Sequence, residues 1–447
     1  MQVHLSALGC RLNEAELQNW AQSFQRIGYA LTSEPEKANL IVLNTCAVTA
    51  EAARKSRQMV RRFHRTNPAA RLVVTGCYAS LEPQEVEKIM GVDLVVANSD
   101  KEILVDKVKE VLDIPVMPEF ATEPGETALF ARNRERAFIK IQDGCRYRCT
   151  YCIVTVARGE EKSRTVESLI EEINQLYQDG IQEIVLAGVH VGGYGSDIDT
   201  SLYQLVKSIL EKTHMPRIRF ASVEPWDLGD NFFELFSNPR LMPHMHLPIQ
   251  SGADSVLKRM SRRCRTEDFK ALVEKARQQV PGFNITTDVI VGFPGESDDE
   301  FEQTLSYIEQ VGFGHIHIFS YSDREGTKAA RLTDKVEKDV KKHRSRQLHV
   351  VAEKLKQQEL AQQVGKVVPV LWESSSQQIE SQVTRYFGYT PNYHKIAIDI
   401  ESGLSPERLI LETKIVALDK DSGHLIGEVD PTQLNKVSAA IAVQTLT

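Results

Sequence analysis

The stretch AFIKIQDGCRYRCTYC, residues 137–152, joins a short apolar run to three closely spaced cysteines. Cys145, Cys149 and Cys152 follow the run in a CxxxCxxC pattern. Three thiolates in one loop can bind a common iron–sulfur cluster and leave one iron without a protein ligand. Such an iron can bind the amino and carboxylate groups of S-adenosylmethionine (SAM), whereas a fully ligated cluster mainly transfers electrons. A zinc knuckle is the alternative, but it needs a fourth Cys or His, and the loop contains none.

The residues around this loop alternate between strand and helix patterns. Six apolar runs predict parallel strands, with helical patterns between them. The predicted strands are 137–141, 183–188, 217–223, 244–249, 285–293 and 315–322, and the helices include 166–179, 199–212 and 298–310. Six strands favour an open or partial (β/α) barrel over a closed barrel of eight. The cysteine loop follows the first strand, at the carboxyl edge where such folds bind ligands.

Residues 3–112 predict a second, smaller parallel sheet covered by helices. Its strands are expected at 3–9, 39–44, 71–76 and 94–98, and its helices at 14–27, 49–64 and 82–90. Cys10, Cys46 and Cys77 each follow one of these strands. Because sequential parallel strands are usually neighbours, the three thiols are expected to converge on one crevice and to bind a second cluster. Any one of them alone would be taken for a small buried hydrophobic residue, and Cys264, which has no cysteine near it, is interpreted that way.

The rest of the chain predicts a linker, one long helix and a small barrel. A polar stretch rich in turn formers separates the two α/β units, and residues 334–361 form a helical pattern without Gly or Pro. Five strand-like runs after Gly365 predict a small antiparallel barrel. The expected boundaries are 1–115 for the first α/β domain, 116–135 for the linker, 136–362 for the central domain with its long helix, 363–432 for the barrel and 433–447 for a tail.

The composition agrees with a globular protein of several domains. The chain has 447 residues, 42% of them hydrophobic and 26% charged. It has no uninterrupted apolar run of about 18 residues and no secretory signal pattern, so a cytoplasmic protein without a membrane span is expected. In a reducing compartment, seven cysteines favour metal ligation over disulfides. The net charge of −7 means that nucleic acid could bind only to local basic patches.

Several motifs together resemble the radical SAM methylthiotransferases over nearly the whole chain. The matching stretches are LGCRLNEAE, NTCAVT, VTGCYA, GCRYRCTYC, ARG, SVEPW, HLPIQSGAD, DVIVGFPGE, YSDREGT and GYTPNYHK. The resemblance implies an N-terminal cluster domain, a central radical SAM domain and a C-terminal TRAM domain, which is an OB-like barrel. It also implies two [4Fe–4S] clusters and SAM as cofactors, the anticodon arm of tRNA as partner and a flavodoxin- or ferredoxin-type electron donor. The oligomeric state stays open.

The segments around the first cysteines most resemble one branch of that family. LGCRLNEAE and NTCAVTAEAARKSRQMVRR are similar to the branch that methylthiolates C2 of N6-threonylcarbamoyladenosine beside the anticodon. In that branch one cluster generates a radical from SAM and the other carries the sulfur. The alternatives within the family are isopentenyladenosine in tRNA and an aspartate of a ribosomal protein. A non-catalytic RNA-binding iron–sulfur sensor would explain the cysteines and the barrel, but not the SAM-type loop.

Five residues are candidates for SAM contacts. The resemblance places an aromatic residue such as Tyr151 near the adenine, although packing within the loop would also explain it. Gly188 opens a Gly-rich turn after a strand, where backbone can approach a ligand, but a plain tight turn needs glycine as well. Glu224, Gln250 and Asp288 lie in or just after the third, fourth and fifth central strands, where a buried acid could hold the ribose or amino group. Structural pairing with an arginine is the alternative for the acids.

Basic and aromatic residues at three places are candidates for RNA contacts. Basic helices are most often solvated faces, but two basic stretches flank the predicted site loops. In the barrel, aromatic side chains could stack on bases or simply fill the core. The candidates are Arg61, Arg62, Arg262, Arg263, Arg385, Tyr389 and Lys395.

Overall fold

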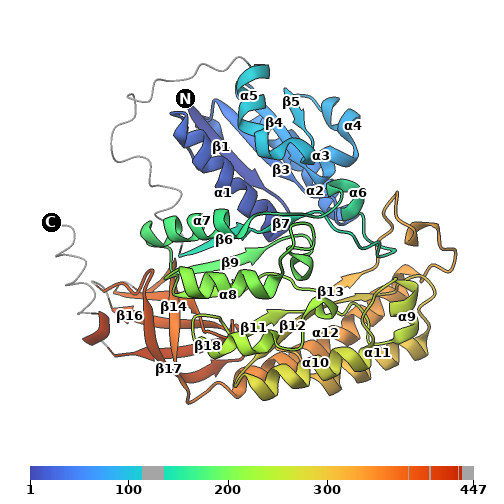
Figure 1. Ribbon diagram of the computed structural model, residues 1–447, viewed down its shortest axis with the longest axis vertical. Helices are drawn as coiled ribbons and strands as arrows, with labels where there is room; N and C mark the ends of the chain where they lie inside the picture. Colours follow the sequence, from blue (N-terminus) through green and yellow to red (C-terminus); the bar gives the residue numbers. More distant parts are fainter. Residues whose placement is uncertain (113–134, 381, 402–403, 431, 435–447) are drawn as a thin grey trace.

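The computed structural model describes residues 1–112, 135–380, 382–401, 404–430 and 432–434. The predicted linker, except for Glu135, and all but the first two residues of the predicted tail lie outside these ranges. Figure 1 shows an N-terminal α/β unit (blue) above a central α/β unit (green to yellow), with a β-barrel (orange to red) beside the central unit. Within the described ranges, no helix combines the length and apolar character required to cross a bilayer.

The N-terminal unit is the predicted parallel sheet. Its strands are β1 (Gln2–Ala7), β2 (Ala30–Leu31), β3 (Leu40–Thr45), β4 (Arg71–Gly76) and β5 (Leu94–Val96), in the order β2-β1-β3-β4-β5. Its helices are α1 (Arg11–Arg26), α2 (Ala50–Thr66), α3 (Cys77–Leu81), α4 (Pro83–Glu87) and α5 (Leu104–Leu112). Alternate residues of β3 point to opposite faces, so Ile41 and Leu43 join one apolar core and Leu40 and Val42 join the other. The short strand β2 was not predicted.

The central unit contains the six predicted parallel strands. They are β6 (Arg136–Lys140), β9 (Glu183–Ala187), β10 (Arg217–Phe220), β11 (His244–His246), β12 (Asn284–Val291) and β13 (His315–Ser320). They form two three-stranded sheets, β6-β9-β10 and β11-β12-β13, joined by parallel bridges such as Ile218 to Leu241. The covering helices are α7 (Val166–Gln178), α8 (Leu202–Lys212), α9 (Asp254–Arg259), α10 (Thr266–Gln279), α11 (Asp298–Val311) and α12 (Lys338–Ala361). This arrangement confirms the partial barrel.

The C-terminal unit is a closed five-stranded barrel, as expected, but it is not wholly antiparallel. Its strands are β14 (Val367–Glu380), β15 (Val383–Tyr389), β16 (Lys395–Glu401), β17 (Ile410–Asp419) and β18 (His424–Val429), in the order β14-β15-β16-β18-β17. The prediction was wrong for β16 and β18, which pair in parallel with Ile396 opposite Leu425. The reason is topological, because β17 pairs with both β14 and β18 and leaves the free edge of β18 to close against β16. Trp372 is fully buried in the core.

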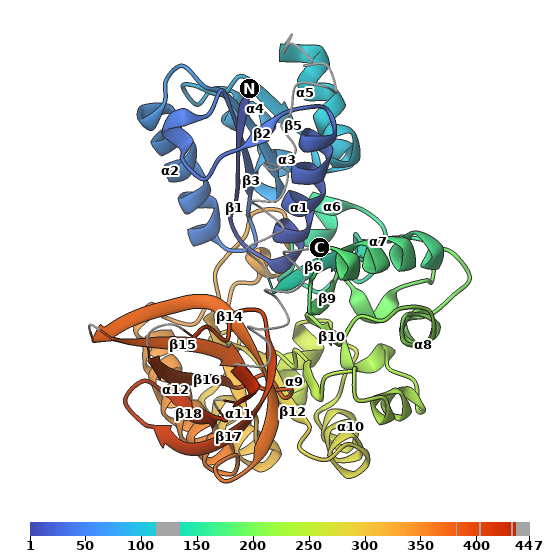
Figure 2. The same ribbon diagram turned by 90° about the vertical axis from the view of Figure 1, so that its left-hand side faces the viewer.

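The barrel covers the amino-terminal ends of the central strands. Arg217, the first residue of β10, donates hydrogen bonds to the carbonyl oxygens of Tyr389 at 3.3 Å and Thr390 at 3.1 Å. Asn284, at the start of β12, donates to the carbonyl oxygen of Asn392 at 2.8 Å. The opposite, carboxyl-terminal ends of these strands remain free of the barrel. The N-terminal unit lies along the edge strand β6, where the Phe138 amide donates to Gln18 Oε1 of α1 at 3.1 Å (Figure 2).

Candidate active site

The central cysteine triad is Cys145, Cys149 and Cys152, in the loop between β7 (Gln142–Asp143) and α6 (Val154–Arg158). Strand β7 pairs with β8 (Lys162–Ser163), and this hairpin closes the base of the loop. The loop is folded on itself, since the Cys152 amide donates to the Cys149 carbonyl oxygen at 3.0 Å. Backbone amides also approach two sulfurs at 3.4 Å, those of Tyr147 to Cys145 Sγ and of Val154 to Cys152 Sγ. All three thiols are free and only half-buried, so a ligand can reach them.

Gly144 allows the loop to turn just before Cys145. Its φ is +71°, in the left-handed region that favours glycine. A Cβ at this position would lie 1.9 Å from the carbonyl oxygen of Glu160, a backbone atom that cannot swing aside. Glycine at 144 therefore sets both the direction of the chain and its close contact with the returning strand.

Burial keeps two of the central thiols, those of Cys145 and Cys152, in their neutral form when no metal is bound. Burial is the main cause that raises the pKa of Cys145 to about 12 and that of Cys152 to about 11, and neighbouring thiols, with Glu224 beside Cys145, contribute to these shifts. Such thiols are protonated at neutral pH, while iron binds the thiolate. Binding of a metal at this triad must therefore release protons.

The N-terminal cysteine triad is Cys10, Cys46 and Cys77, which the fold brings together from three strand ends. Cys10 precedes the first turn of α1, Cys46 follows β3, and Cys77 is the first residue of α3. Ser56 on α2 fixes the backbone of Cys46, because its hydroxyl accepts from the Cys46 amide at 3.2 Å and donates to the Cys46 carbonyl oxygen at 3.0 Å. The pKa of Cys46 is raised to about 11, mainly by burial and in part by the negative charge that Cys77 and Cys10 can carry. The three sulfurs are thus electrostatic neighbours.

Gly9 brings the first of these strand ends against the second. Its φ is +102°, and a Cβ built on it would lie 2.6 Å from both Cβ and Sγ of Cys46. A side chain at this position would occupy the space of the Cys46 thiol. The glycine before Cys10 is therefore part of the triad's geometry.

A buried ionic network, which includes Glu16 and Arg158, joins the two triads. Arg158, at the end of α6, donates to Glu16 Oε1 at 2.9 Å and to Asn13 Oδ1 at 2.9 Å, both on α1. Lys101 pairs with Glu16 Oε2 at 2.6 Å, and Asp143 accepts from Arg158 at 2.9 Å. Burial alone raises the pKa of Glu16, but Lys101 and Arg158 outweigh it and hold that pKa well below its usual range. The network locks the central loop onto the N-terminal unit.

The two triads face each other across α3 and α6. Asn98 Nδ2 donates to the carbonyl oxygen of Ala157 at 2.7 Å and lies 3.9 Å from Cys77 Sγ. Cys77 also contributes to raising the pKa of Cys152 in the other triad. Lys101 and Arg158 place positive charge close to Cys77. An anionic group bound by the N-terminal triad would therefore be partly neutralised by the protein.

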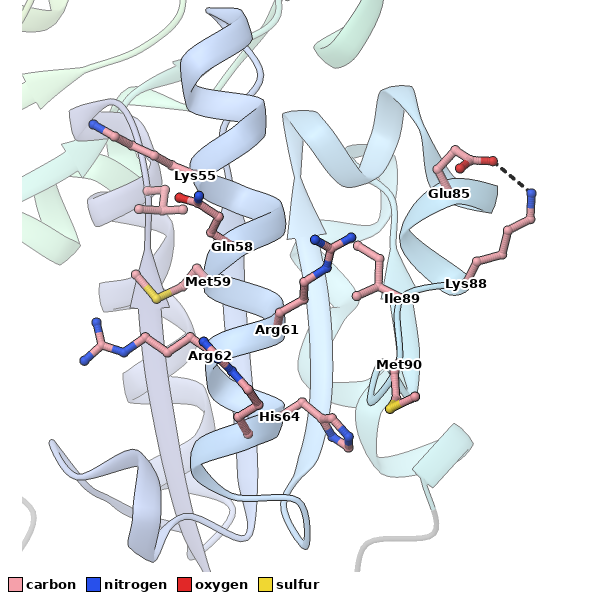
Figure 3. A pocket seen from close by; sticks show the side chains of 12 residues that line it. Lys55, Gln58, Met59, Arg61, Arg62, His64, Glu85, Lys88, Ile89 and Met90 are labelled. Atoms are coloured by element: carbon pink, nitrogen blue, oxygen red, sulfur yellow. Dashed lines mark hydrogen bonds and ion pairs between the residues drawn. The ribbon is translucent and has the colours of Figure 1, made fainter.

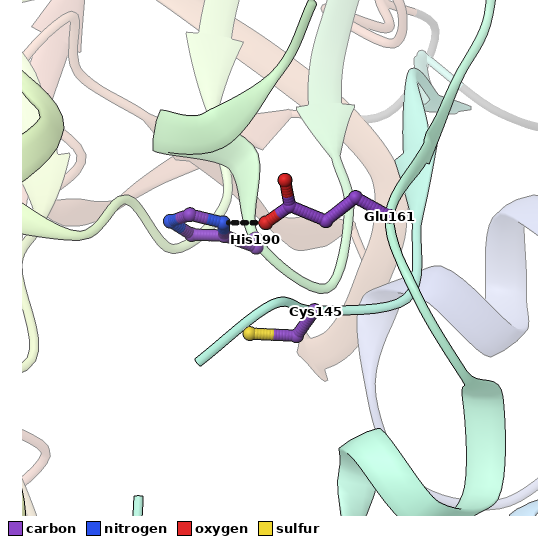
Figure 4. Close-up of side chains that lie close together, drawn as sticks. All are labelled: Cys145, Glu161 and His190. Atoms are coloured by element: carbon purple, nitrogen blue, oxygen red, sulfur yellow. Dashed lines mark hydrogen bonds and ion pairs between the residues drawn. The ribbon is translucent and has the colours of Figure 1, made fainter. Parts of the chain in front are cut away.

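His190 lies near Cys145 and is bonded to the Glu161 carboxylate (Figure 4). Its Nδ1 is hydrogen-bonded to Glu161, and its Nε2 lies 2.6 Å from Asp227 Oδ2. Burial alone lowers the pKa of His190, but the three carboxylates around it, those of Asp227, Glu224 and Glu161, outweigh burial and raise it. Ligand atoms of Cys145, Glu161 and His190 lie within 4.8 Å of one another. The sequence analysis did not predict this set, because it sought a fourth ligand only within the cysteine loop. Both ring nitrogens already have carboxylate partners, so His190 braces Glu161 and Asp227.

Two of the SAM candidates lie close to the central triad. Tyr151 is half-buried and packs against an apolar cluster that includes Val256 of α9, and burial raises its pKa. Glu224 Oε2 is buried and, among the described residues, has no hydrogen-bond partner; His190 Nε2 lies 3.9 Å away. Burial raises the pKa of Glu224 as well. An orphaned carboxylate oxygen beside the cysteine loop is available to a ligand.

The other three SAM candidates are held by the protein itself. Gly188 lies against Gln142, whose Oε1 would be 3.0 Å from a Cβ at 188. Gln250 has φ +80° and extends β11 by backbone hydrogen bonds with β12, from its amide to the carbonyl oxygen of Asp288 and from the Ile290 amide to its own carbonyl oxygen, both 2.9 Å. Asp288 Oδ1 lies 3.0 Å from His246 Nε2. The partner of Asp288 is thus a histidine and not the arginine considered as the alternative.

Comparisons with known proteins agree with this architecture. The model of an uncharacterized protein family, UPF0004, matches residues 2–97, and that of the Radical SAM superfamily matches residues 139–308. The threonylcarbamoyladenosine tRNA methylthiotransferase MtaB of Bacillus subtilis is 36% identical over 88% of this chain and 89% of its own length. MtaB of Thermotoga maritima is 38% identical, over 79% of this chain and 82% of its own length.

This chain belongs to the radical SAM methylthiotransferase family. Another member that matches it is the tRNA-2-methylthio-N(6)-dimethylallyladenosine synthase of Staphylococcus epidermidis, 34% identical over 86% of this chain and 77% of its own length. The fold is also that of the radical SAM methyltransferase TsrM from Kitasatospora setae, with a TM-score of 0.55 and 14% identity over 74% of this chain and 77% of that one.

Membership implies that this methylthiotransferase uses SAM and [4Fe–4S] clusters, and its residues fit both. Each triad offers three thiols. A four-iron cluster bound by them would have one iron without a protein ligand, and that iron could bind another group. The buried oxygen of Glu224 without a partner fits a polar group of SAM next to the central triad. Of the seven cysteines, Cys264 belongs to neither triad and is buried in the core beneath the helices, as expected for a structural residue.

The surface of the methylthiotransferase carries a basic groove on α2 (Figure 3). The groove has a volume of about 950 Å³ and is lined by Leu8, Lys55, Gln58, Met59, Arg61, Arg62, His64, Arg65, Glu85, Lys88, Ile89 and Met90. Arg61 and Arg62, two of the RNA candidates, are exposed on it. Leu8, two residues before Cys10, also lines the groove, so one end of the groove adjoins the N-terminal triad, while Arg61 and Arg62 lie near the far end of α2.

The remaining RNA candidates lie in different surroundings. Arg263 is exposed and stacks on Tyr147 at 4.6 Å, beside the cysteine loop. Arg262 turns inward, 4.3 Å over Trp226 and with Nη1 3.9 Å from Cys149 Sγ. In the barrel, the Arg385 guanidinium pairs with Asp399 at 2.7 Å, Tyr389 stacks on Tyr393 at 4.8 Å, and the Lys395 ammonium lies 4.4 Å from the Phe387 ring.

Sequence reasoning missed the residues that join the triads. Arg158 stands in a motif that matched the family, but nothing in the sequence links it to Glu16, which lies 142 residues away. Glu16 falls on the buried face of α1, where a charged residue in an apolar stripe is a recognisable signal. Lys101 has no comparable signal, because it lies in a short turn before α5.

Proposed function

We propose that this protein methylthiolates C2 of N6-threonylcarbamoyladenosine beside the anticodon of tRNA. The observation that carries the proposal is the pair of three-thiol sites facing each other across α3 and α6. Relatives with that activity in their names match the chain over most of its length. A reaction that needs both a radical and a sulfur source requires two such sites within reach of one base.

The central triad would hold the cluster that binds SAM, and the N-terminal triad the cluster that carries sulfur. When bound, these groups supply a radical that activates C2 and the methylthio group that replaces its hydrogen. Tyr151, Glu224 and Gln250 would line the SAM end of the site, next to the central triad. Asp288 lies two residues before Ile290 on β12 and extends the site into the interior of the central partial barrel.

The protein's own contribution is to hold the two triads in a fixed relation. Arg158 and Glu16 fix the distance between the loop and the N-terminal sheet because both are almost fully buried. Arg262 lies against Cys149 and Trp226, where its charge favours an anionic cluster without occupying a ligand position. Preorganisation of this kind removes the need to rearrange charge during the reaction.

The anticodon arm would bind across the basic groove of α2 and the rim of the cysteine loop. Arg61 and Arg62 would contact phosphates, and Arg263 lies at the rim. The barrel, residues 363–432, would act as a TRAM domain, with Arg385, Tyr389 and Lys395 as its candidate contacts. Replacing Arg61 and Arg62 together by glutamine should weaken tRNA binding, flatten its dependence on salt and leave SAM cleavage without RNA unchanged.

The reaction implies further partners. One-electron reduction of the central cluster needs a donor, for which a flavodoxin or ferredoxin of the cytoplasm is suited. Methylthiolation of isopentenyladenosine is the second candidate, because a dimethylallyladenosine synthase is 34% identical to this chain. The ribosomal aspartate and the non-catalytic sensor have no comparable support.

The test is anaerobic turnover of reconstituted protein with SAM, dithionite and tRNA that carries either N6-threonylcarbamoyladenosine or N6-isopentenyladenosine. Mass spectrometry of the nucleosides should show the methylthio product on the first tRNA and 5′-deoxyadenosine in solution. Product only on the second tRNA would replace the proposed substrate by the second candidate. Absence of 5′-deoxyadenosine with both clusters loaded would contradict the enzyme proposal itself.

A further inference from the structure

The inner face of β11, β12 and β13 carries a line of polar side chains that the cysteine sites do not use. His246, Asp288 and His317 lie on three adjacent strands, and Asp288 is directly opposite His317 in the register of β12 and β13. Their ligand atoms lie within 4.8 Å of one another. The rings of His246 and His317 are 5.4 Å apart, and those of His315 and His317 are 4.6 Å apart.

The alternation of the strands shows that this line faces the interior of the partial barrel. The neighbours Met245, Val289 and Ile316 all belong to the apolar core beneath the covering helices. Because successive residues of a strand point to opposite faces, His246, Asp288 and His317 point away from that core. His317 is nevertheless exposed, so the interior at this level is open to solvent.

These side chains are not all paired with one another. His246 is held on both sides, with Nδ1 2.9 Å from Thr286 Oγ1 and Nε2 3.0 Å from Asp288 Oδ1. Among the described residues, neither ring nitrogen of His317 has a hydrogen-bond partner. The side chain of Asp288 is 23% exposed, and His246 is its one recorded partner within the described part of the chain. The set therefore offers a free donor and a free acceptor side by side.

An exposed aromatic ring lies at the next level of the same face. Phe319 is two residues after His317 and is 45% exposed. It is opposite Ile290, which packs against the same apolar cluster as Tyr151 of the cysteine loop. Two residues of a strand span about 7 Å, so Phe319 lies at the level of the loop and His317 one step deeper in the barrel. An exposed phenylalanine beside a radical site is suited to stack on a base.

We propose that this face is the pocket for the modified base, with Phe319 under the adenine, His317 donating a hydrogen bond to the threonyl carboxylate and Asp288 accepting one from a urea N–H. This assignment rests on the proposed function and names the residues that select its substrate. C2 and the N6 substituent leave the adenine ring in different directions, so a base with C2 toward the cysteine loop directs its substituent into the barrel. The dimethylallyl group has no polar atom. Burying it here would leave His317 without a partner and Asp288 with His246 alone, and an unpaired buried polar group costs binding free energy.

A metal ion is the rival occupant, because two histidines and one carboxylate are a common ligand set. The geometry favours the substrate. His246 Nε2 is already engaged with Asp288 at hydrogen-bond distance, and Phe319 on the same face has no role in a metal site. Binding of a metal ion at this site is therefore one of the outcomes of the test.

The experiment compares two synthetic anticodon stem–loops, one with N6-threonylcarbamoyladenosine and one with its uncharged carboxamide. Binding to the reconstituted protein is measured by fluorescence anisotropy, and methylthiolation by single-turnover assay. The wild-type protein should prefer the acid by about 10- to 100-fold, the range of a hydrogen bond to a charged group. His317→Ala should bind both equally, His317→Gln should restore part of the preference because its amide donates, and His214→Ala, an exposed histidine beside Tyr177, should behave as wild type.

The possible failures are distinguishable. If the wild-type protein modifies the acid stem–loop and His317→Ala keeps the full preference, the pocket assignment is wrong while the proposed function stands. If the wild-type protein modifies only an isopentenyladenosine stem–loop, both are wrong. Stoichiometric binding of Zn²⁺ or Fe²⁺ by the wild-type protein that is lost in His317→Ala, with the acid preference unchanged, would assign the site to a metal.

Discussion

The two cysteine triads each present three thiols, but one is built from a single loop and the other from three separate strand ends. Cys145, Cys149 and Cys152 lie in one loop, so their spacing is set by local backbone and by the hairpin that closes it. Cys10, Cys46 and Cys77 come from three strand ends and meet only when the parallel sheet has formed. The central triad should therefore tolerate damage elsewhere in the fold, whereas the N-terminal triad depends on its whole domain. The ionic network of Arg158 connects the central loop to the N-terminal unit.

Removing Arg158 should give the largest effect, because it breaks the connection between the two regions. In Arg158→Ala, Asp143 and Glu16 lose one buried partner each but keep Lys140 and Lys101, respectively. The loss should therefore cost about 3 kcal/mol, the lower end of the range for a broken buried pair. The free energy of unfolding, measured with urea on the apo protein by circular dichroism, should fall by about that amount. The control is Arg148→Ala in the same loop, whose pair with Glu160 is exposed and should contribute less than about 1 kcal/mol. Equal losses in the two variants would show that the network does not join the domains.

Two glycine substitutions should separate the triads. Gly9→Ala places a methyl group against Cys46, and Gly144→Ala places one against the Glu160 carbonyl. Each variant should lose the iron of its own triad and keep that of the other, as measured by iron and sulfide content after anaerobic reconstitution. Gly159→Ala is the matched control, since its φ is also positive at +78° but no atom lies within 4 Å of the added Cβ. If Gly9→Ala emptied the central triad as well, the independence of the two sites would be refuted.

The sequence predicted the features of the fold that depend on local residue patterns. Apolar runs located the strands, and cysteines placed after successive parallel strands indicated that the three thiols converge. The sequence did not predict contacts between residues far apart in the chain, such as the pair of Lys101 and Glu16, which are 85 residues apart. The inward turn of Arg262 toward Trp226 could not be predicted, because a basic run looks the same whether a given side chain faces solvent or the protein interior. The parallel pairing of β16 with β18 depends on barrel closure, which no single strand encodes.

The smallest expected effect is a difference in thiol reactivity within the N-terminal triad. Cys10 is exposed, whereas Cys46 is buried with its pKa raised to about 11. At pH 8 a thiol of that pKa has about 100-fold less thiolate than an ordinary cysteine. Alkylation of the apo protein by iodoacetamide, followed by peptide mass spectrometry, should therefore label Cys10 first. The rate at Cys46 should rise about tenfold per pH unit up to about pH 11, and a rate independent of pH would contradict the neutral buried thiol.

The most direct test of the two-site account is the iron content of single cysteine variants, measured together with SAM cleavage. Cys46→Ala and Cys149→Ala should each retain half of the wild-type iron and sulfide after anaerobic reconstitution. Reduction in the presence of SAM should yield 5′-deoxyadenosine from Cys46→Ala but none from Cys149→Ala. Loss of all iron in either variant, or SAM cleavage that depends on Cys46, would contradict two separate cluster sites.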